Sequence, residues 1–181
     1  MRGRALRTAQ SEQEVPGVLL AMTTRLRKAG LMLRIAYVEL QYWGLGLTPE
    51  FYHWRQGEAF ELLGRYRKAA HHFRRYLSTK DNPQVRGLLA YCYAKLGSWP
   101  EAAREYEAAD KAMPMASLSM GYATALAALG KNDQALAVVA AIEERYAELD
   151  GSYRNAIETL KQRIRKSESS VMQDAGAGGA C

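Results

Sequence analysis

Apolar residues recur along this chain at the spacing of one face of an α-helix, and glycines separate the apolar stretches at a regular interval. Gly64, Gly97 and Gly130 follow one another every 33 residues, and Gly30 lies 34 residues before the first of them. After each of the last three glycines, a small residue and a large apolar residue recur at fixed offsets. These pairs are Ala69 and Phe73, Ala102 and Tyr106, and Ala135 and Val139. A helical stripe on both sides of a regularly repeated glycine predicts an array of antiparallel helix pairs.

The spacing predicts three such helix pairs within residues 48–149, at about 50–79, 83–113 and 116–147. Small residues let two helices approach closely, and large apolar residues fill the space beside them. The positions predicted to pack the repeats are Gly64, Ala69, Phe73, Gly97, Ala102, Tyr106, Gly130 and Ala135. The predicted fold class is therefore all-α, a solenoid of three helical hairpins with helices added at both ends.

Local signals mark where the predicted helices begin. Thr48 and Asn82 each precede a proline, which combines an N-cap side chain with the residue best tolerated at the first helical position. Ser98 and Glu101 have the spacing of a capping box, in which each side chain bonds the backbone of the other. These signals place helix starts at the same points as the apolar periodicity.

The N-terminal part of the chain does not follow the repeat. Residues 1–16 are basic and are predicted to form a flexible leader. Residues 17–47 are predicted to form N-terminal helices, at 17–29 and 31–44, with a turn at Gly30. This segment is either a degenerate leading hairpin or a dimerisation segment.

Residues 18–43 hold more apolar side chains than a terminal segment needs. These are Leu19, Met22, Leu26, Leu31, Leu33, Ile35, Val38, Leu40, Tyr42 and Trp43. One interpretation buries the surplus against the first repeat of the same chain. The other buries it against a second copy of the chain, as a homodimer, because large exposed apolar patches on soluble proteins usually mark interfaces.

The C-terminal part is predicted to close the array. Residues 151–167 form an amphipathic pattern, with polar positions around Tyr153, Ile157, Leu160 and Ile164. This is the pattern expected of a capping helix that covers the last repeat with one face and presents the other to water. Residues 168–181 are polar and rich in glycine and alanine, and are predicted to be a disordered tail.

Charge changes the picture little. The 181-residue chain has a formal net charge of +6, but its first 34 residues hold seven Arg or Lys against two Glu, so the array itself is close to neutral. A repeat protein that reads RNA with its own face needs Lys and Arg there to neutralise phosphates. Nucleic-acid binding is therefore a remote alternative, confined to the basic leader and expected to weaken steeply with salt.

The residues that usually carry chemistry are few and scattered. Cys92 and Cys181 have neither metal-site nor disulfide spacing, and His71 and His72, being adjacent, point about 100° apart on a helix. With His53 they form no ligand set, so no catalytic residue, metal or cofactor is predicted, and an enzyme is the least supported class. No apolar stretch approaches the roughly 20 residues of a membrane span, and the expected location is the cytoplasm.

The repeat resembles the tetratricopeptide repeat (TPR) over about residues 50–147. The resemblance rests on the Ala-x-x-x-[Phe/Tyr] pairs and the Gly-x-[Tyr/Trp] turns that accompany Gly64 and Gly97, and on Pro114. It implies a right-handed superhelix whose concave groove holds a segment of a partner protein. The groove positions that it implies in this chain are Trp54, Glu58, Glu61, Leu88, Tyr91, Lys95, Met120 and Thr124. An apolar client segment lying against the aromatic positions is the partner expected.

The layout is also similar to that of the class II chaperones of bacterial type III secretion, which guard translocator proteins. They have N-terminal helices, three TPR units, one further helix and a short polar tail. In that family the N-terminal helices take part in dimerisation, and the groove holds a short apolar segment of the translocator. The alternative function is a structural adaptor, a subunit that makes a permanent contact in a larger assembly.

Overall fold

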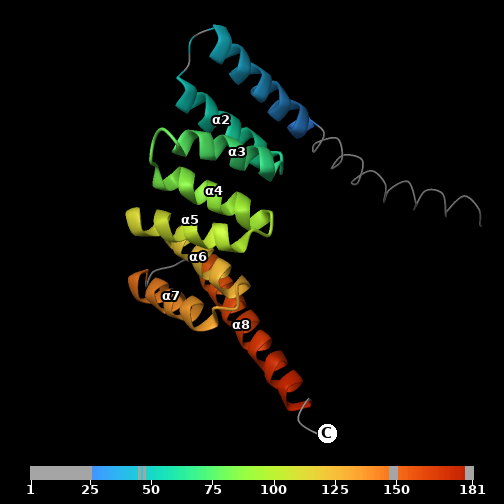
Figure 1. The fold of residues 1–181 in the computed structure, drawn as a ribbon, viewed down its shortest axis with the longest axis vertical. Coiled ribbons are helices and arrows are strands. Elements are labelled where there is room, and N and C mark those ends of the chain that lie inside the picture. The colour runs from blue at the N-terminus through green and yellow to red at the C-terminus, as the bar shows by residue number, and fades with distance from the viewer. Residues whose placement is uncertain (1–25, 45, 47, 147–150, 178–181) are drawn as a thin grey trace, which may run out of the picture. The chain divides into compact units, whose positions relative to one another are not determined.

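The computed structural model describes residues 26–44, 46, 48–146 and 151–177, and every regular element in these ranges is an α-helix (Figure 1). The chain divides into two compact units, Met1–His72 and Phe73–Cys181, and the division falls within a helix. The predicted leader, Leu19 and Met22 lie outside the described residues. None of the described helices is long and apolar enough to cross a lipid bilayer.

The six helices of the three hairpins begin and end close to the positions that the sequence predicts. The first unit holds a helix over residues 26–44, then α2 (Pro49–Leu62) and the start of α3 (Tyr66–Leu77). The second unit holds the rest of α3 and five further helices. They are α4 (Pro83–Lys95), α5 (Trp99–Ala112), α6 (Ala116–Ala128), α7 (Asn132–Arg145) and α8 (Gly151–Ala177).

The three repeat glycines end their helices in the same way. Gly64, Gly97 and Gly130 have φ values of 70°, 76° and 72°, a left-handed conformation that costs a residue with a Cβ about 1–2 kcal/mol. The amide of the next residue then donates back into the finished helix. The donor and acceptor pairs are Arg65 N to Phe60 O (2.8 Å), Ser98 N to Tyr93 O (3.0 Å) and Lys131 N to Leu126 O (3.0 Å). This C-terminal turn explains why glycine recurs at the period of the array.

The predicted N-caps are confirmed at two helices and the capping box is wrong. Thr48 Oγ1 accepts a hydrogen bond from the amide of Phe51 at 3.4 Å, and Asn82 Oδ1 accepts from the amide of Gln84 at 2.9 Å. Ser98 starts α5 but makes no side-chain cap. In a capping box the glutamate side chain accepts a hydrogen bond from the backbone amide of the capping serine. Here the amide of Ser98 already donates to the carbonyl of Tyr93 in the glycine turn. The box therefore has no free donor to use.

The turn predicted at Gly30 is also wrong, because residues 26–44 are helical without a break. Gly30 has no positive φ, and Leu31 directly after it has no side chain that could cap a new helix. A glycine inside a helix costs about 1 kcal/mol relative to alanine, which strong helix formers on both sides can offset. The segment is one helix rather than a leading hairpin over the residues described.

One of the core clusters of the second unit is built mainly from small side chains. Ala90, Ala102 and Ala109 are completely buried where α4, α5 and α6 meet, together with the ring of Tyr106. Each helix contacts its neighbours in the chain, α4 with α5, α5 with α6 and α6 with α7. Alanine at these contacts lets the helix axes approach closely, as the predicted packing positions require.

The capping helix α8 covers the last hairpin. Ile157, Leu160 and Ile164 are buried in one cluster with Val139 and Ile142 of α7, and Lys161 Nζ bonds Glu143 Oε1 of α7 at 2.7 Å. The prediction of a disordered tail from residue 168 is wrong as far as Ala177, where the helix ends. No proline interrupts this stretch, and extending an existing helix costs far less than starting one. Residues 178–181 lie outside the described ranges.

Candidate functional site

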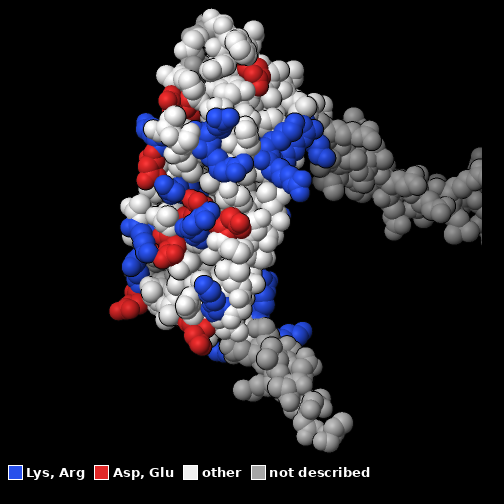
Figure 2. Space-filling model, viewed as in Figure 1, with Lys and Arg blue, Asp and Glu red and all other residues white. Residues whose placement is uncertain are grey.

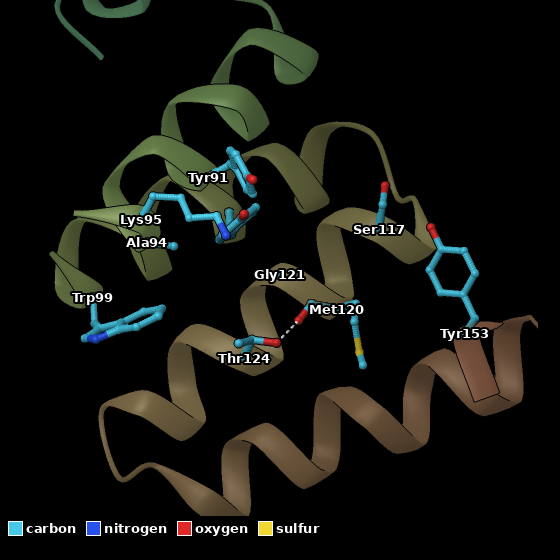
Figure 3. Close-up of a pocket in the computed structure, with 10 residues that line it drawn as sticks. Tyr91, Ala94, Lys95, Trp99, Ser117, Met120, Gly121, Thr124 and Tyr153 are labelled. Carbon is cyan, nitrogen blue, oxygen red and sulfur yellow. Dashed lines mark hydrogen bonds between the residues drawn. The ribbon is translucent and has the colours of Figure 1, made fainter. Parts of the chain in front are cut away.

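The second unit contains a cavity of about 420 Å³ between α4, α5, α6 and α8 (Figure 3). Its walls are mostly aromatic or aliphatic. The lining residues are Tyr91, Ala94 and Lys95 of α4, Trp99 and Tyr106 of α5, Ser117, Met120, Gly121 and Thr124 of α6, and Tyr153 of α8. A volume of this size holds one or two large side chains of a partner, which is the usual scale of a protein's ligand pocket.

One cation stands among the apolar walls. Lys95 Nζ lies 5.2 Å from the ring centroid of Tyr91, within the range of a cation–π interaction. Lys95 makes no ion pair with a described carboxylate, and none of the described lining residues is acidic. In Figure 3, Lys95 and Trp99 lie toward one end of the pocket and Ser117 and Tyr153 toward the other. The pocket therefore offers apolar contact over most of its surface and positive charge at one end.

Gly121 shapes the floor of the pocket. A Cβ at this position would lie 2.5 Å from Cε1 of Tyr106, closer than real side-chain contacts allow. The missing side chain leaves room for the Tyr106 ring beside Gly121 of α6, and this ring is almost fully buried. Burial raises the pKa of the Tyr106 hydroxyl to about 12, so this wall is neutral at physiological pH.

The structure brings together half of the predicted groove positions. Tyr91, Lys95, Met120 and Thr124 all line the cavity, whereas Leu88 does not. Six lining residues were not predicted as groove positions. They are Ala94, Trp99, Ser117, Gly121, Tyr153 and Tyr106, the last of which was predicted to pack the repeats instead. Trp99 begins α5 directly after the glycine turn that ends α4 at Lys95, and this closeness across the turn was the signal available in the sequence.

The other predicted groove positions lie on α2 in the first unit. Trp54 packs edge to face against Phe51, with ring centroids 6.4 Å apart. Glu58 accepts a charged hydrogen bond from Arg55 at 2.8 Å. Burial, together with the charge of Glu58, raises the pKa of the Glu61 carboxyl. That these three residues bind a partner stays a prediction.

The first unit also contains a histidine pair that the sequence did not indicate. Nδ1 of His53 lies 3.1 Å from Nδ1 of His72, a hydrogen bond between α2 and α3. The ring of His72 also stacks on Phe60 at a centroid distance of 5.4 Å. Burial, followed by the charges of His53, His71 and Lys68, lowers the pKa of His72 to about 4. Among the described residues, no group of three or more side chains could hold a metal ion here or elsewhere.

Charged residues of both signs are mixed over the face shown in Figure 2. The distribution along individual helices is less even, because α3 carries four Arg or Lys and no Asp or Glu. The array is thus near neutral as a whole, as the sequence predicts, although one of its helices is basic. The lining of the cavity in the second unit holds a single Lys or Arg, Lys95.

The comparisons with known proteins point to one fold. A family model described as a tetratricopeptide repeat matches residues 62–117. The solved complex of the TPR2B domain of yeast Sti1 with pHsp70 matches at a TM-score of 0.60 and 20% identity, covering 66% of this chain and 98% of that chain. Yeast Tom70 matches at a TM-score of 0.57 and 18% identity, covering 68% of this chain but 26% of that chain. No curated protein matches the chain in sequence.

These likenesses agree with the helix pairs, the glycine turns and the small-residue contacts described above. The matched residues run from the end of α2 to the start of α6 and include the whole second hairpin. The chain is therefore an all-α solenoid with the tetratricopeptide-repeat fold.

Proposed function

We propose that this protein is a non-enzymatic binding module that holds an apolar segment of a partner protein in the cavity of its second unit. The observation that carries the proposal is the lining of the cavity, in which Tyr91, Trp99 and Met120 surround a volume of about 420 Å³. Large aromatic side chains in partly enclosed pockets contribute most of the energy in protein interfaces. Solved proteins of this fold include one captured with a partner, the TPR2B domain of yeast Sti1 with pHsp70.

Lys95 sets the expected character of the bound segment. A client that places apolar side chains against Met120 and Tyr91 would bring its backbone or an acidic neighbour close to the ammonium group. A cation that faces no carboxylate in its own pocket favours a partner that carries one, because charge complementarity selects among otherwise similar apolar segments. The proposed ligand is therefore an apolar segment with an acidic residue at one end.

The test is selection from a displayed peptide library, followed by affinity measurements on selected peptides with purified variants. Met120→Ala removes a pocket wall, and Met115→Ala is the matched control, because Met115 is exposed and does not line the cavity. The proposal expects selected peptides to lose about 30-fold or more in affinity with Met120→Ala, the equivalent of about 2 kcal/mol, and to bind Met115→Ala normally. Equal binding to both variants would show that the cavity is not the binding site.

We extend the proposal to the class of client. The arrangement of a helix before the array, three hairpins and one closing helix supports a chaperone of the kind that guards type III secretion translocators. Such a client is a secreted protein with membrane-inserting segments. The test is whether the purified protein keeps a membrane-inserting protein encoded beside its gene soluble, and whether Met120→Ala abolishes this protection. The extension is contradicted if the client aggregates in the presence of the wild-type protein, or if the wild-type protein and Met120→Ala keep it soluble equally well.

The exposed apolar side chains of the first unit support a second contact. On the helix over residues 26–44, Leu33, Leu40 and Trp43 are largely exposed. We propose that two copies of the chain associate through this helix. Sedimentation of the full-length protein measures this directly, and a monomer at micromolar concentration would contradict it. The adaptor alternative places a different subunit on the same face, and predicts that the isolated protein is monomeric or aggregates.

A further inference from the structure

The helix over residues 26–44 has two apolar faces, and the first is already occupied. Val38 is buried, and Tyr52 OH of α2 donates to Glu39 Oε1 at 2.8 Å. Gln56, also on α2, donates to the same oxygen at 3.0 Å and to the carbonyl of Ile35 at 3.3 Å. These bonds set the rotation of the helix about its own axis, so that the side centred on Ile35 and Val38 faces α2.

The second face lies on the opposite side of the same helix. Leu26, Leu33 and Leu40 are 69%, 71% and 70% exposed, and Trp43 is 82% exposed. The leucines stand seven residues apart, and the exposed residues Ala29, Ala36 and Trp43 form a second row with the same spacing, three positions later. Two rows offset in this way are the a and d positions of a coiled-coil seam.

We propose that this seam pairs with the same seam of a second copy, antiparallel, with Leu33 opposite Ala36 and Ala29 opposite Leu40 of the partner. This inference rests on the proposed dimer and specifies its geometry. In an antiparallel pair the a residues of one helix face the d residues of the other. Only one register places Leu33 on Ala36, and it also places Leu40 on Ala29 and Leu26 on Trp43. The four inner layers of that pairing each combine a large side chain with a small one.

The parallel pairing fits less well. It would place leucine against leucine in alternate layers and alanine against alanine in the layers between. Wide and narrow layers would then alternate along the seam, and the alanine layers would leave gaps that a close-packed interface does not tolerate. The antiparallel arrangement also sets the two helix dipoles in opposite directions, which is the favourable orientation for neighbours.

The size of the exposed surface matches a second copy. Met32 and Tyr37 flank the seam on its two sides and are also exposed. With the three leucines and Trp43 they present on the order of 600–1,000 Å² per copy, if a large side chain has about 150–250 Å² of surface and each is scaled by its exposed fraction. A stable protein interface buries about 800 Å² on each partner.

A lipid surface is the competing occupant, and two features argue against it. A helix that lies on a membrane presents a charged face opposite its apolar face, whereas this helix buries its opposite face on α2. Lipid contact also places no demand on the alternation of large and small residues, which the seam shows at Leu33, Ala36, Leu40 and Ala29.

Disulfide cross-linking tests the register in the full-length protein. The background is Cys181→Ser, and Cys92 is retained because it is buried. Ala29→Cys and Leu40→Cys proteins are prepared separately, oxidised alone and oxidised as a mixture. In the proposed register each position is eleven residues from its own copy, roughly 16 Å along the axis and beyond disulfide reach. The mixture should therefore give a cross-linked heterodimer and each protein alone should give little.

The other outcomes separate the register from the dimer. Cross-linking of Ala29→Cys with itself, and no heterodimer in the mixture, would show a parallel pair and overturn the register while leaving the dimer intact. A monomer by sedimentation, with binding to vesicles of phosphatidylserine and phosphatidylcholine, would overturn both. Leu33→Glu should convert the dimer to a monomer that keeps its helical circular dichroism. Arg27→Glu, an exposed position outside the seam, is the matched control and should remain dimeric. None of these results bears on the Met120 test of the cavity.

Discussion

The absence of a Cβ atom at a glycine determines how closely two helices of this protein approach, and Gly121 is the clearest example. The ring of Tyr106 occupies the space that a side chain at Gly121 would need. We expect Gly121→Ala to destabilise the second unit by about 1–3 kcal/mol, because the buried ring can move only by disturbing the alanine-rich core. Urea unfolding followed by circular dichroism measures this change.

Gly30→Ala is the comparison, since Gly30 also lies inside a helix but a Cβ added there would have no other atom within 4 Å. Alanine there improves helix propensity at no steric cost, so the same substitution should stabilise by up to about 1 kcal/mol. Opposite signs at the two glycines are the expected outcome. A neutral Gly121→Ala would mean that the Tyr106 ring has room to move.

His72 provides a prediction about pH. Its pKa is lowered to about 4 in the folded protein from an ordinary value of 6.5, mainly by burial. Between these values the unfolded chain binds a proton that the folded chain does not, so stability falls as pH is lowered from about 6.5 toward 4. His72→Gln should flatten this part of the profile of melting temperature against pH. His71→Gln, at the adjacent exposed histidine, should reduce the slope much less, because the charge of His71 is only a secondary cause of the lowered pKa of His72. An unaltered slope with His72→Gln would assign the effect to other groups.

At the scale of elements, α8 matters because it closes the core. Leu160 is buried against the last hairpin, and replacing it with alanine removes a methine and both methyl groups from that cluster. We expect Leu160→Ala to cost about 2–5 kcal/mol, the usual range for a leucine lost from a core. Chemical denaturation of the two purified variants checks this, with Thr159→Ala as control, because Thr159 is exposed on the same helix. A cost below about 1 kcal/mol would show that α8 is only loosely held.

The helices of the array were predictable because their signals are local. The left-handed turn at Gly97 and the cap at Asn82 each depend on residues within about one helical turn. Two wrong predictions, the turn at Gly30 and the capping box at Ser98, arose where the surrounding residues favoured a different local structure. Gly30 has the spacing of the repeat glycines but lacks a helix start after it, and the Ser98 box lost its donor to the preceding turn.

At the scale of the whole molecule, the sequence indicated which helices form and which faces pack, but not the full lining of the cavity. Tyr153 reaches the pocket from α8, which follows the third hairpin, and its place there depends on how α8 crosses the array. The same limit applies to His53 and His72, which lie 19 residues apart and meet through the packing of two helices. Contacts of this kind depend on how the helices pack in three dimensions, which the periodicity of the sequence does not specify.

The position of Tyr153 links recognition to folding. The helix that supplies this wall of the cavity is also the helix that seals the hydrophobic core with Ile157 and Leu160. A ligand that contacts α6 and α8 together would hold the capping helix against the last hairpin. Because such a ligand binds only the folded protein, its binding free energy would raise the melting temperature. A rise in melting temperature could then identify a ligand without any assay of what the ligand does.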